Sequence, residues 1–90
     1  MKSNEKNLFK TSEFILICAL AYHGEVIESF ESDPINPRRA VAVFAYSKEL
    51  DEIRGKLFSG ALDVEPIRFW NLVRELKSDI RNALQRNSWK

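Results

Sequence analysis

Cys18 and His23 are the residues of this sequence that could act as a nucleophile and a proton carrier, and the 90-residue chain contains one of each type. Both lie in or directly after an apolar run from Phe14 to Tyr22. If that run is a helix, its turn of about 100° per residue separates the two side chains by roughly 140° around the axis. That separation is too large for a nucleophile and its base. We therefore expect Cys18 to be an inert core thiol and His23 to interact with the negative end of the helix dipole.

No other spacing of residues is typical of catalysis or of a bound group. A single cysteine cannot form an intrachain disulfide, and the sequence contains no zinc, calcium or HExxH motif. The three glycines, Gly24, Gly55 and Gly60, are isolated, so none belongs to a glycine-rich phosphate loop. The sequence therefore predicts a protein that is not an enzyme and that holds no metal and no cofactor.

The segment from Pro66 to about Gln85 is the most informative part of the sequence. At about 100° per residue, one face of a helix here is apolar and forms a core face, with Phe69, Leu72, Val73, Leu76, Ile80 and Ala83. One flank of that face carries an aromatic and three basic residues: Trp70, Arg74, Lys77 and Arg81. Like charges four residues apart, such as Lys77 and Arg81, cost an isolated helix roughly a few tenths of a kcal/mol. The grouping of basic residues on one flank therefore does not stabilise the helix itself.

Two interpretations of this basic flank remain open. The basic stems can cover apolar surface while their charged ends stay in water, with Trp70 sealing the core. Alternatively, the flank is a contact surface, because Trp and Arg are enriched at interface hot spots and can hold a nucleic-acid backbone with a stacked base. Arg38 and Arg39, in a predicted loop, are a second basic candidate. They could bind an anion, or they could protect an edge of the sheet or pair with Glu31 and Asp33 nearby in the sequence.

The helix that must position Cys18 and His23 is predicted from the residues at its two ends. It is predicted from Glu13 to about His23, with a side-chain cap from Thr11 or Ser12 and a left-handed end at Gly24. The alternative is a strand with a hairpin turn at His23 and Gly24, because the run is apolar on every face and periodicity cannot decide. The good helix formers in the run favour the helix.

Two strands and two further helices complete the prediction, over residues 25–31, 40–46, 48–58 and 66–85. In the first strand, simple alternation separates Val26, Glu28 and Phe30 from Ile27, Ser29 and Glu31. The second strand is apolar on both faces, which is typical of a strand covered on both sides. Ser47 is expected to cap the helix that follows it, and Pro66 to begin the last one. The fold class is therefore α+β in the order α-β-β-α-α: a β-hairpin packed by helices, with a possible short N-terminal strand at Leu8–Lys10.

The length and composition fit one small domain. We expect a flexible arm over residues 1–7, a single domain over 8–86 and a frayed tail over 87–90. Hydrophobic residues make up 44% of the chain and charged residues 30%, which is typical of a folded globular protein. The N-terminus lacks the apolar segment of a signal peptide, and the longest apolar run is about half of the ~20 residues that span a bilayer. The sequence therefore predicts a cytoplasmic protein that does not associate with a membrane.

The order of these features resembles a known family. The residues that carry the resemblance are Phe9-Lys10-Thr11 before the apolar helix, Arg38-Arg39 before Val41-Ala42-Val43-Phe44, Leu57-Phe58-Ser59-Gly60, Leu62, Val64, Phe69-Trp70 and Leu76-Lys77. Over roughly residues 9–80 the chain is similar to a family of small prokaryotic proteins known only as a domain of unknown function. The resemblance implies the order of elements and no catalytic residue.

The apolar content predicts a partner. The first helix is apolar all round, the second strand is apolar on both faces, and a chain of this size has few layers with which to cover them. We therefore expect a non-enzymatic interaction module that self-associates as a homodimer, with a further protein partner that the sequence does not identify. The alternative is a nucleic-acid-binding accessory protein that uses Arg38, Arg39, Arg74, Lys77 and Arg81. The net charge of +1 argues against that alternative.

Overall fold

The computed structural model describes the backbone of residues 7–87 and the side chains of residues 7–85. Its elements are β1 (Leu8–Thr11), α1 (Phe14–Tyr22), β2 (Ile27–Ser32), β3 (Ala40–Ala45), α2 (Lys48–Ser59) and α3 (Pro66–Asn87). The α+β class is therefore confirmed, and the apolar run is a helix rather than a strand. The predicted flexible arm and frayed tail fall almost wholly outside the described residues. None of the described helices is both long and apolar enough to cross a membrane.

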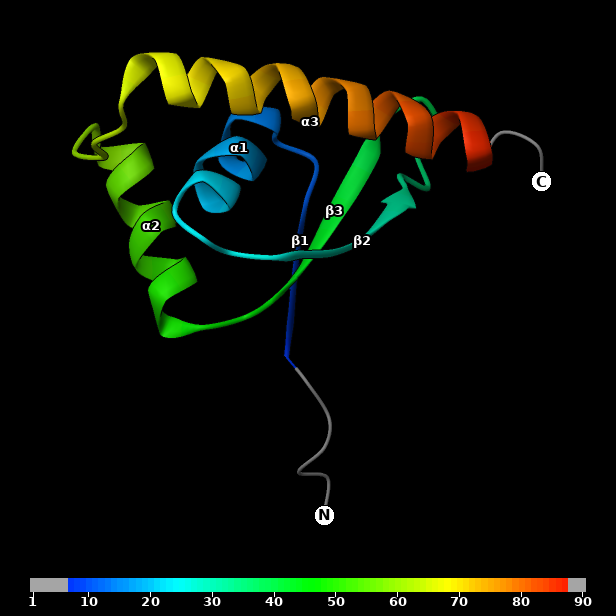
Figure 1. The fold of residues 1–90 in the computed structure, drawn as a ribbon. Coiled ribbons are helices and arrows are strands. Elements are labelled where there is room, and N and C mark those ends of the chain that lie inside the picture. The colour runs from blue at the N-terminus through cyan, green and yellow to red at the C-terminus, as the bar shows by residue number, and fades with distance from the viewer. Residues whose placement is uncertain (1–6, 88–90) are drawn as a thin grey trace.

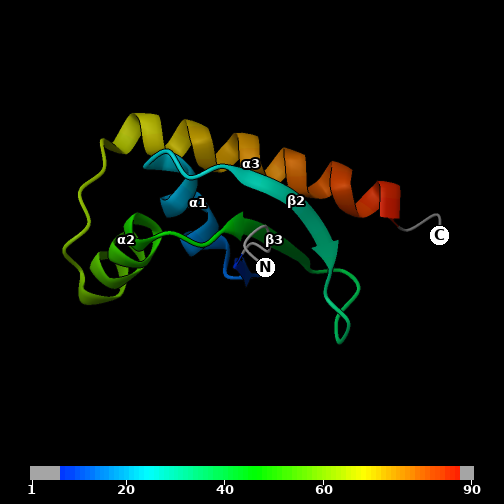
Figure 2. The same ribbon diagram turned by 90° about the horizontal axis from the view of Figure 1, so that it is seen from below.

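The sheet has three antiparallel strands in the order β1-β3-β2, as Figures 1 and 2 show. The short N-terminal strand pairs along β3, with Leu8 opposite Ala45 and Thr11 opposite Ala42. The backbone N–H of Tyr46 extends this ladder by donating to the carbonyl of Asn7 at 2.9 Å. The expected hairpin is therefore one half of a larger sheet, and β3 is its central strand.

Strict alternation along β2 was the wrong expectation, because the strand contains a bulge. Ile27 pairs with Phe44 and Ser29 with Val43, so Glu28 is an extra residue on this edge strand. The insertion puts Ile27 and Phe30 on the same face of the sheet, and both pack against the core. Sequence alternation had placed these two residues on opposite faces.

The core lies between the sheet and the helices on one of its faces. Phe44 and Ala42 of β3 are fully buried there, together with five consecutive residues of α1, Leu16 to Leu20. Figure 1 shows α1 lying beneath α3 and beside α2, which explains how a helix apolar on every side is covered within one chain. The sequence argument therefore overestimated how much of α1 needs a partner.

The opposite face of the sheet carries no helix in the described part of the chain (Figure 2). An ion pair crosses β3 on this face, with Lys10 Nζ of β1 at 3.2 Å from Glu31 Oε1 of β2. Lys10 and Ser29 pair with Val43 from either side, and Val43 is 3% exposed. The ion pair thus crosses the face of β3 on which the sequence had predicted a covering layer.

Local signals explain where the helices begin and end. Gly24 has a φ of 98°, and the N–H groups of Gly24 and Glu25 return to the last turn of α1, as expected. The start of α1 differs from the prediction, because Glu13 occupies the N-cap position without a side-chain cap bond. Thr11 Oγ1 instead accepts from the backbone N–H of Glu13 at 3.0 Å. Ser47 caps α2 as predicted, its Oγ accepting from the N–H of Leu50 at 3.0 Å.

Candidate functional site

Three contacts hold the start of α3 against α1. Tyr22 Oη accepts a hydrogen bond from the backbone N–H of Glu65 at 2.9 Å. Glu65 Oε1 accepts from the N–H of Arg68 at 2.8 Å and so satisfies a donor in the first turn of the helix. The ring of Phe69 meets the ring of Tyr22 edge to face, with centroids 5.7 Å apart. Because Phe69 is fixed toward α1, the next residue, Trp70, is turned to the flank of α3, where it is 57% exposed.

Trp70 stands at the edge of an apolar groove between α1 and α3. The groove has a volume of about 500 Å³ and is lined by Phe14, Ile15, Val64, Pro66, Phe69, Trp70, Val73 and Lys77. Lys77 alone among these residues has a charged side chain. Ile15 on the α1 wall is 48% exposed and Ile67, beside Pro66 on α3, is 69% exposed. The surface is therefore an apolar hollow with large hydrophobic side chains at its border.

The predicted basic flank is only partly assembled at this groove. Trp70 and Lys77 line it, whereas Arg74 borders a shallow hollow with Asn71 and Glu75. Among the described residues, the flank residues Arg74, Lys77 and Arg81 form no ion pair. Their charges are thus available to a partner or to water.

Arg81 instead meets the second basic candidate, which the sequence had treated as separate. Arg38 and Arg81 line one hollow of about 240 Å³ with Pro37, Leu84 and Gln85. Arg39 does not line it, and its carbonyl accepts from the N–H of Asp33 at 3.0 Å within the β2–β3 loop. Of the alternatives for the two arginines, pairing with Glu31 and Asp33 is not formed: Glu31 pairs with Lys10, and Asp33 Oδ1 accepts from the backbone N–H of Ile35 at 2.8 Å.

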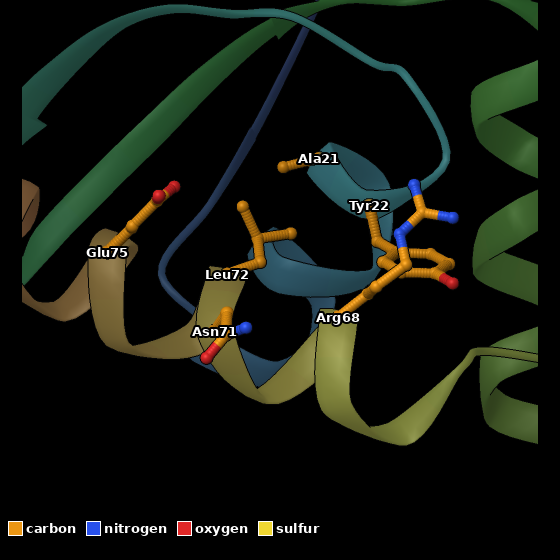
Figure 3. A pocket seen from close by; sticks show the side chains of 6 residues that line it. All are labelled: Ala21, Tyr22, Arg68, Asn71, Leu72 and Glu75. Carbon is orange, nitrogen blue, oxygen red and sulfur yellow. The ribbon is translucent and has the colours of Figure 1, made fainter.

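A polar pocket of about 310 Å³ lies on the other side of α3, and Figure 3 shows its side chains. Arg68 reaches over the ring of Tyr22, with its guanidinium carbon 5.7 Å from the ring centroid. Asn71 and Glu75 follow along the helix, and none of the predicted site residues is present. Arg68 is thus engaged by the aromatic ring, and the pocket brings no nucleophile next to a base.

The two chemically reactive side chains lie apart from these surfaces. Cys18 is fully buried, and desolvation raises the pKa of its thiol from 9.0 to about 11, although the charge of Lys77 opposes the rise. His23 is exposed, with its ring edge-on to Tyr22 at 5.1 Å between centroids. In the described part of the chain, no three His, Cys, Asp or Glu side chains gather into a group suited to a metal ion. The prediction that Cys18 is a core thiol is confirmed.

Sequence reasoning missed half of the apolar groove. Phe14 and Ile15 were treated as part of a helix that needed cover, and Val64 as part of an extended link. One sequence signal for this wall was that α1 is apolar on every side. Its neighbours cannot cover all of it, and Ile15 is half exposed in the structure. Nothing in the local sequence indicates that Val64 and Pro66 close one end of the groove.

Comparison of the chain with protein-family models, with curated proteins and with solved structures found no match. The resemblance to a family of small prokaryotic proteins therefore stays a prediction.

Proposed function

We propose that this protein is a non-enzymatic interaction module that self-associates, with the groove between α1 and α3 as its contact surface. The observation that carries the proposal is the position of Trp70, half exposed at the edge of a groove lined almost wholly by carbon. Apolar surface of this kind gains stability when it is removed from water. Tryptophan is also the residue type most enriched at interface hot spots.

The neighbouring residues support a contact surface rather than a solvated helix flank. Ile15 of α1 and Trp70 of α3 bring two large exposed apolar side chains to the walls of one groove. Single exposed hydrophobic residues are ordinary, but a group of them around a hollow is typical of an interaction site.

A second copy of the chain is the occupant that fits this surface. The patch contains both a projecting indole, that of Trp70, and a hollow beside it. A two-fold interface brings the same patch of two copies together, so each projection can meet the other copy's hollow. A surface that contains both parts is therefore complementary to itself.

The non-enzymatic part of the proposal rests on the separation of the reactive groups. Cys18 is buried with a raised pKa, so its thiol is protonated at neutral pH. His23 is exposed on the far end of α1 and does not approach it. A nucleophile without a nearby base gives no route to covalent catalysis.

Sedimentation equilibrium between 1 and about 100 µM tests the proposal, since a dimer that buries about 1,200 Å² or more should persist in this range. We expect Trp70→Ala to weaken self-association by about 30-fold, the equivalent of the roughly 2 kcal/mol that defines a hot spot. Phe58→Ala is the matched control, because Phe58 is 66% exposed on α2 and does not line the groove. A monomeric wild-type protein, or an equal effect of the two substitutions, would refute the proposal.

Nucleic-acid binding is the second candidate function, and one observation favours it. Arg38 and Arg81 come from different elements and share a hollow, with Arg39 next in the chain. If these arginines contact phosphate, affinity for a single-stranded oligonucleotide should fall steeply between 50 and 200 mM salt. The loss of Arg81 should then reduce the slope of log affinity against log salt concentration by about one. No binding of the oligonucleotide at 50 mM salt would reject this candidate.

A further inference from the structure

We infer that two copies pair with their α3 helices antiparallel along the groove, across a two-fold axis that crosses the helix at the level of residues 71 and 72. This inference rests on the proposed self-association and specifies how it is made. Each Trp70 then packs at the groove of the other copy, and the acidic end of each groove meets the basic end of its partner.

The extent of the groove along α3 sets the region of contact. Its lining runs from Pro66 to Lys77, which is about 16 Å at a rise of 1.5 Å per residue. Pro66, Phe69, Trp70, Val73 and Lys77 recur at intervals of three or four residues, so they follow one side of the helix. A second helix laid along this side contacts the groove over about three turns.

The charges at the two ends of the groove are opposite. Asp63 and Glu65 flank Val64, which closes the groove at the start of α3. Lys77 lines the other end, and Arg81 follows one turn later. Among the described residues, neither Asp63 nor the two basic side chains form an ion pair. Each end thus presents unpaired charge at the position where an antiparallel partner brings the opposite sign.

An axis near residues 71 and 72 brings specific residues together. Asp63 comes opposite the partner's Arg81, and Glu65 comes within about one turn of the partner's Lys77. Trp70 comes opposite the partner's Arg74, whose guanidinium can lie over the indole as a cation–π contact. The basic residues grouped on one flank of α3, which do not stabilise the isolated helix, contact the partner's acidic residues and indole in this arrangement.

Parallel helices do not satisfy the same charges. A parallel pair would set Lys77 and Arg81 against themselves, and like charges across an interface are unfavourable. The open face of the sheet is less apolar than the groove, because the charged Lys10–Glu31 pair lies across β3 there. The antiparallel arrangement along α3 is therefore the one that uses both the groove and its charged ends.

The test exchanges the charges at the two ends of the groove. A basic-end variant carries Lys77→Glu with Arg81→Glu, and an acidic-end variant carries Asp63→Lys with Glu65→Gln. Glutamine keeps an oxygen that can accept from the N–H of Arg68, so the start of α3 retains its cap. Lys48→Glu with Lys56→Glu on α2 is the matched control for net charge, because both lysines are exposed and outside the groove.

We expect each end variant alone to self-associate about tenfold more weakly than wild type or worse, because like charges then face each other at both ends of the interface. A one-to-one mixture of the two variants should form heterodimers about as tightly as wild type forms homodimers, as measured by native mass spectrometry and sedimentation. A chain with all four substitutions should recover its homodimer. In a parallel pair the end variants would not have weakened it, because each end faces itself and like charges meet before and after the exchange. The α2 control should behave as wild type.

The outcomes separate this inference from the proposed function. If wild type is monomeric at about 100 µM, the proposed self-association fails and the pairing fails with it. If wild type dimerises but the end variants do so equally well, or their mixture shows no recovery, the antiparallel pairing alone is overturned. Should a double variant fail to melt cooperatively, the exposed single substitutions Asp63→Lys and Arg81→Glu make the same comparison.

Discussion

Trp70 and Phe69 are adjacent in sequence but have different surroundings. Phe69 packs against Tyr22 and the core, whereas Trp70 is 57% exposed at the edge of the groove. The difference follows from the helix, which turns consecutive side chains by about 100°. Helical spacing therefore predicted that Trp70 and Lys77 lie on a flank of the core face, and the structure places both in the groove. The opposite wall, with Ile15, could not be predicted because it depends on how α1 crosses α3.

At the residue scale, the state of Cys18 gives a prediction about reactivity. Burial raises the pKa of this thiol to about 11, so at pH 8 the native protein should react slowly with iodoacetamide, because the thiolate is the reactive form. The protein unfolded in guanidinium should be alkylated rapidly at the same pH. Mass spectrometry of timed samples measures both rates.

Equal alkylation rates for the native and the unfolded protein would contradict this assignment.

The raised pKa of Cys18 also has a consequence for stability. The folded state favours the protonated thiol, so this contribution is fully present below pH 9 and is lost as the pH rises through about 11.

At the scale of elements, local signals determined the helices but not the sheet. Ser47 and Pro66 begin α2 and α3 at the predicted positions, and Gly60 ends α2 with a φ of 80°. The bulge at Glu28 and the pairing of β1 with β3 depend on residues far along the chain. The register of paired strands depends on both strands and on the turn between them, and not on the periodicity of one segment alone. The sheet was therefore predicted as a plain hairpin with strict alternation.

The cap of α2 gives a prediction at this scale. Ser47 Oγ accepts from the N–H of Leu50, and Leu50 is itself fully buried. Ser47→Ala should lower the free energy of unfolding by about 1 kcal/mol, the usual cost of losing such a cap. Denaturation in urea, monitored by circular dichroism, measures the change.

Ser78→Ala is the control for this substitution. Ser78 is exposed within α3 and caps no helix, so its replacement should change the free energy of unfolding by no more than about 0.5 kcal/mol. If both variants lose the same free energy, the cap of α2 does not stabilise the fold as we expect.

At the scale of the whole molecule, large exposed apolar side chains occur on several elements, but two of them, Ile15 and Trp70, share the walls of one groove. Most of α1 is buried in the core, and the Lys10–Glu31 ion pair crosses the open face of the sheet. The groove beside Trp70 is left with an apolar lining and no cover from the described chain. The early estimate that α1 and β3 both need a partner was thus too broad, because tertiary packing supplies most of their cover.

Self-association through this groove should link thermal stability to protein concentration. A partner that binds only the folded chain stabilises it by about 2.7 kcal/mol when its concentration is 100 times the Kd. In a domain of this size such a gain raises Tm by about 10 °C or more. We expect Tm of the wild type to rise between 1 and about 100 µM and Tm of Trp70→Ala to rise less over the same range. A wild-type Tm that is independent of concentration would contradict the linkage.

The position of β3 at the centre of the sheet has a consequence for folding during translation. Both edge strands precede β3 in the chain, so the ribosome releases them before their shared partner exists. Leu8 cannot pair until Ala45 has emerged, and the intervening chain must then close as a loop. Until that moment α1 has neither sheet nor α3 to cover it, and its apolar side chains are exposed to solvent. A nascent chain that stalls before β3 is therefore a good substrate for chaperones that bind extended apolar segments.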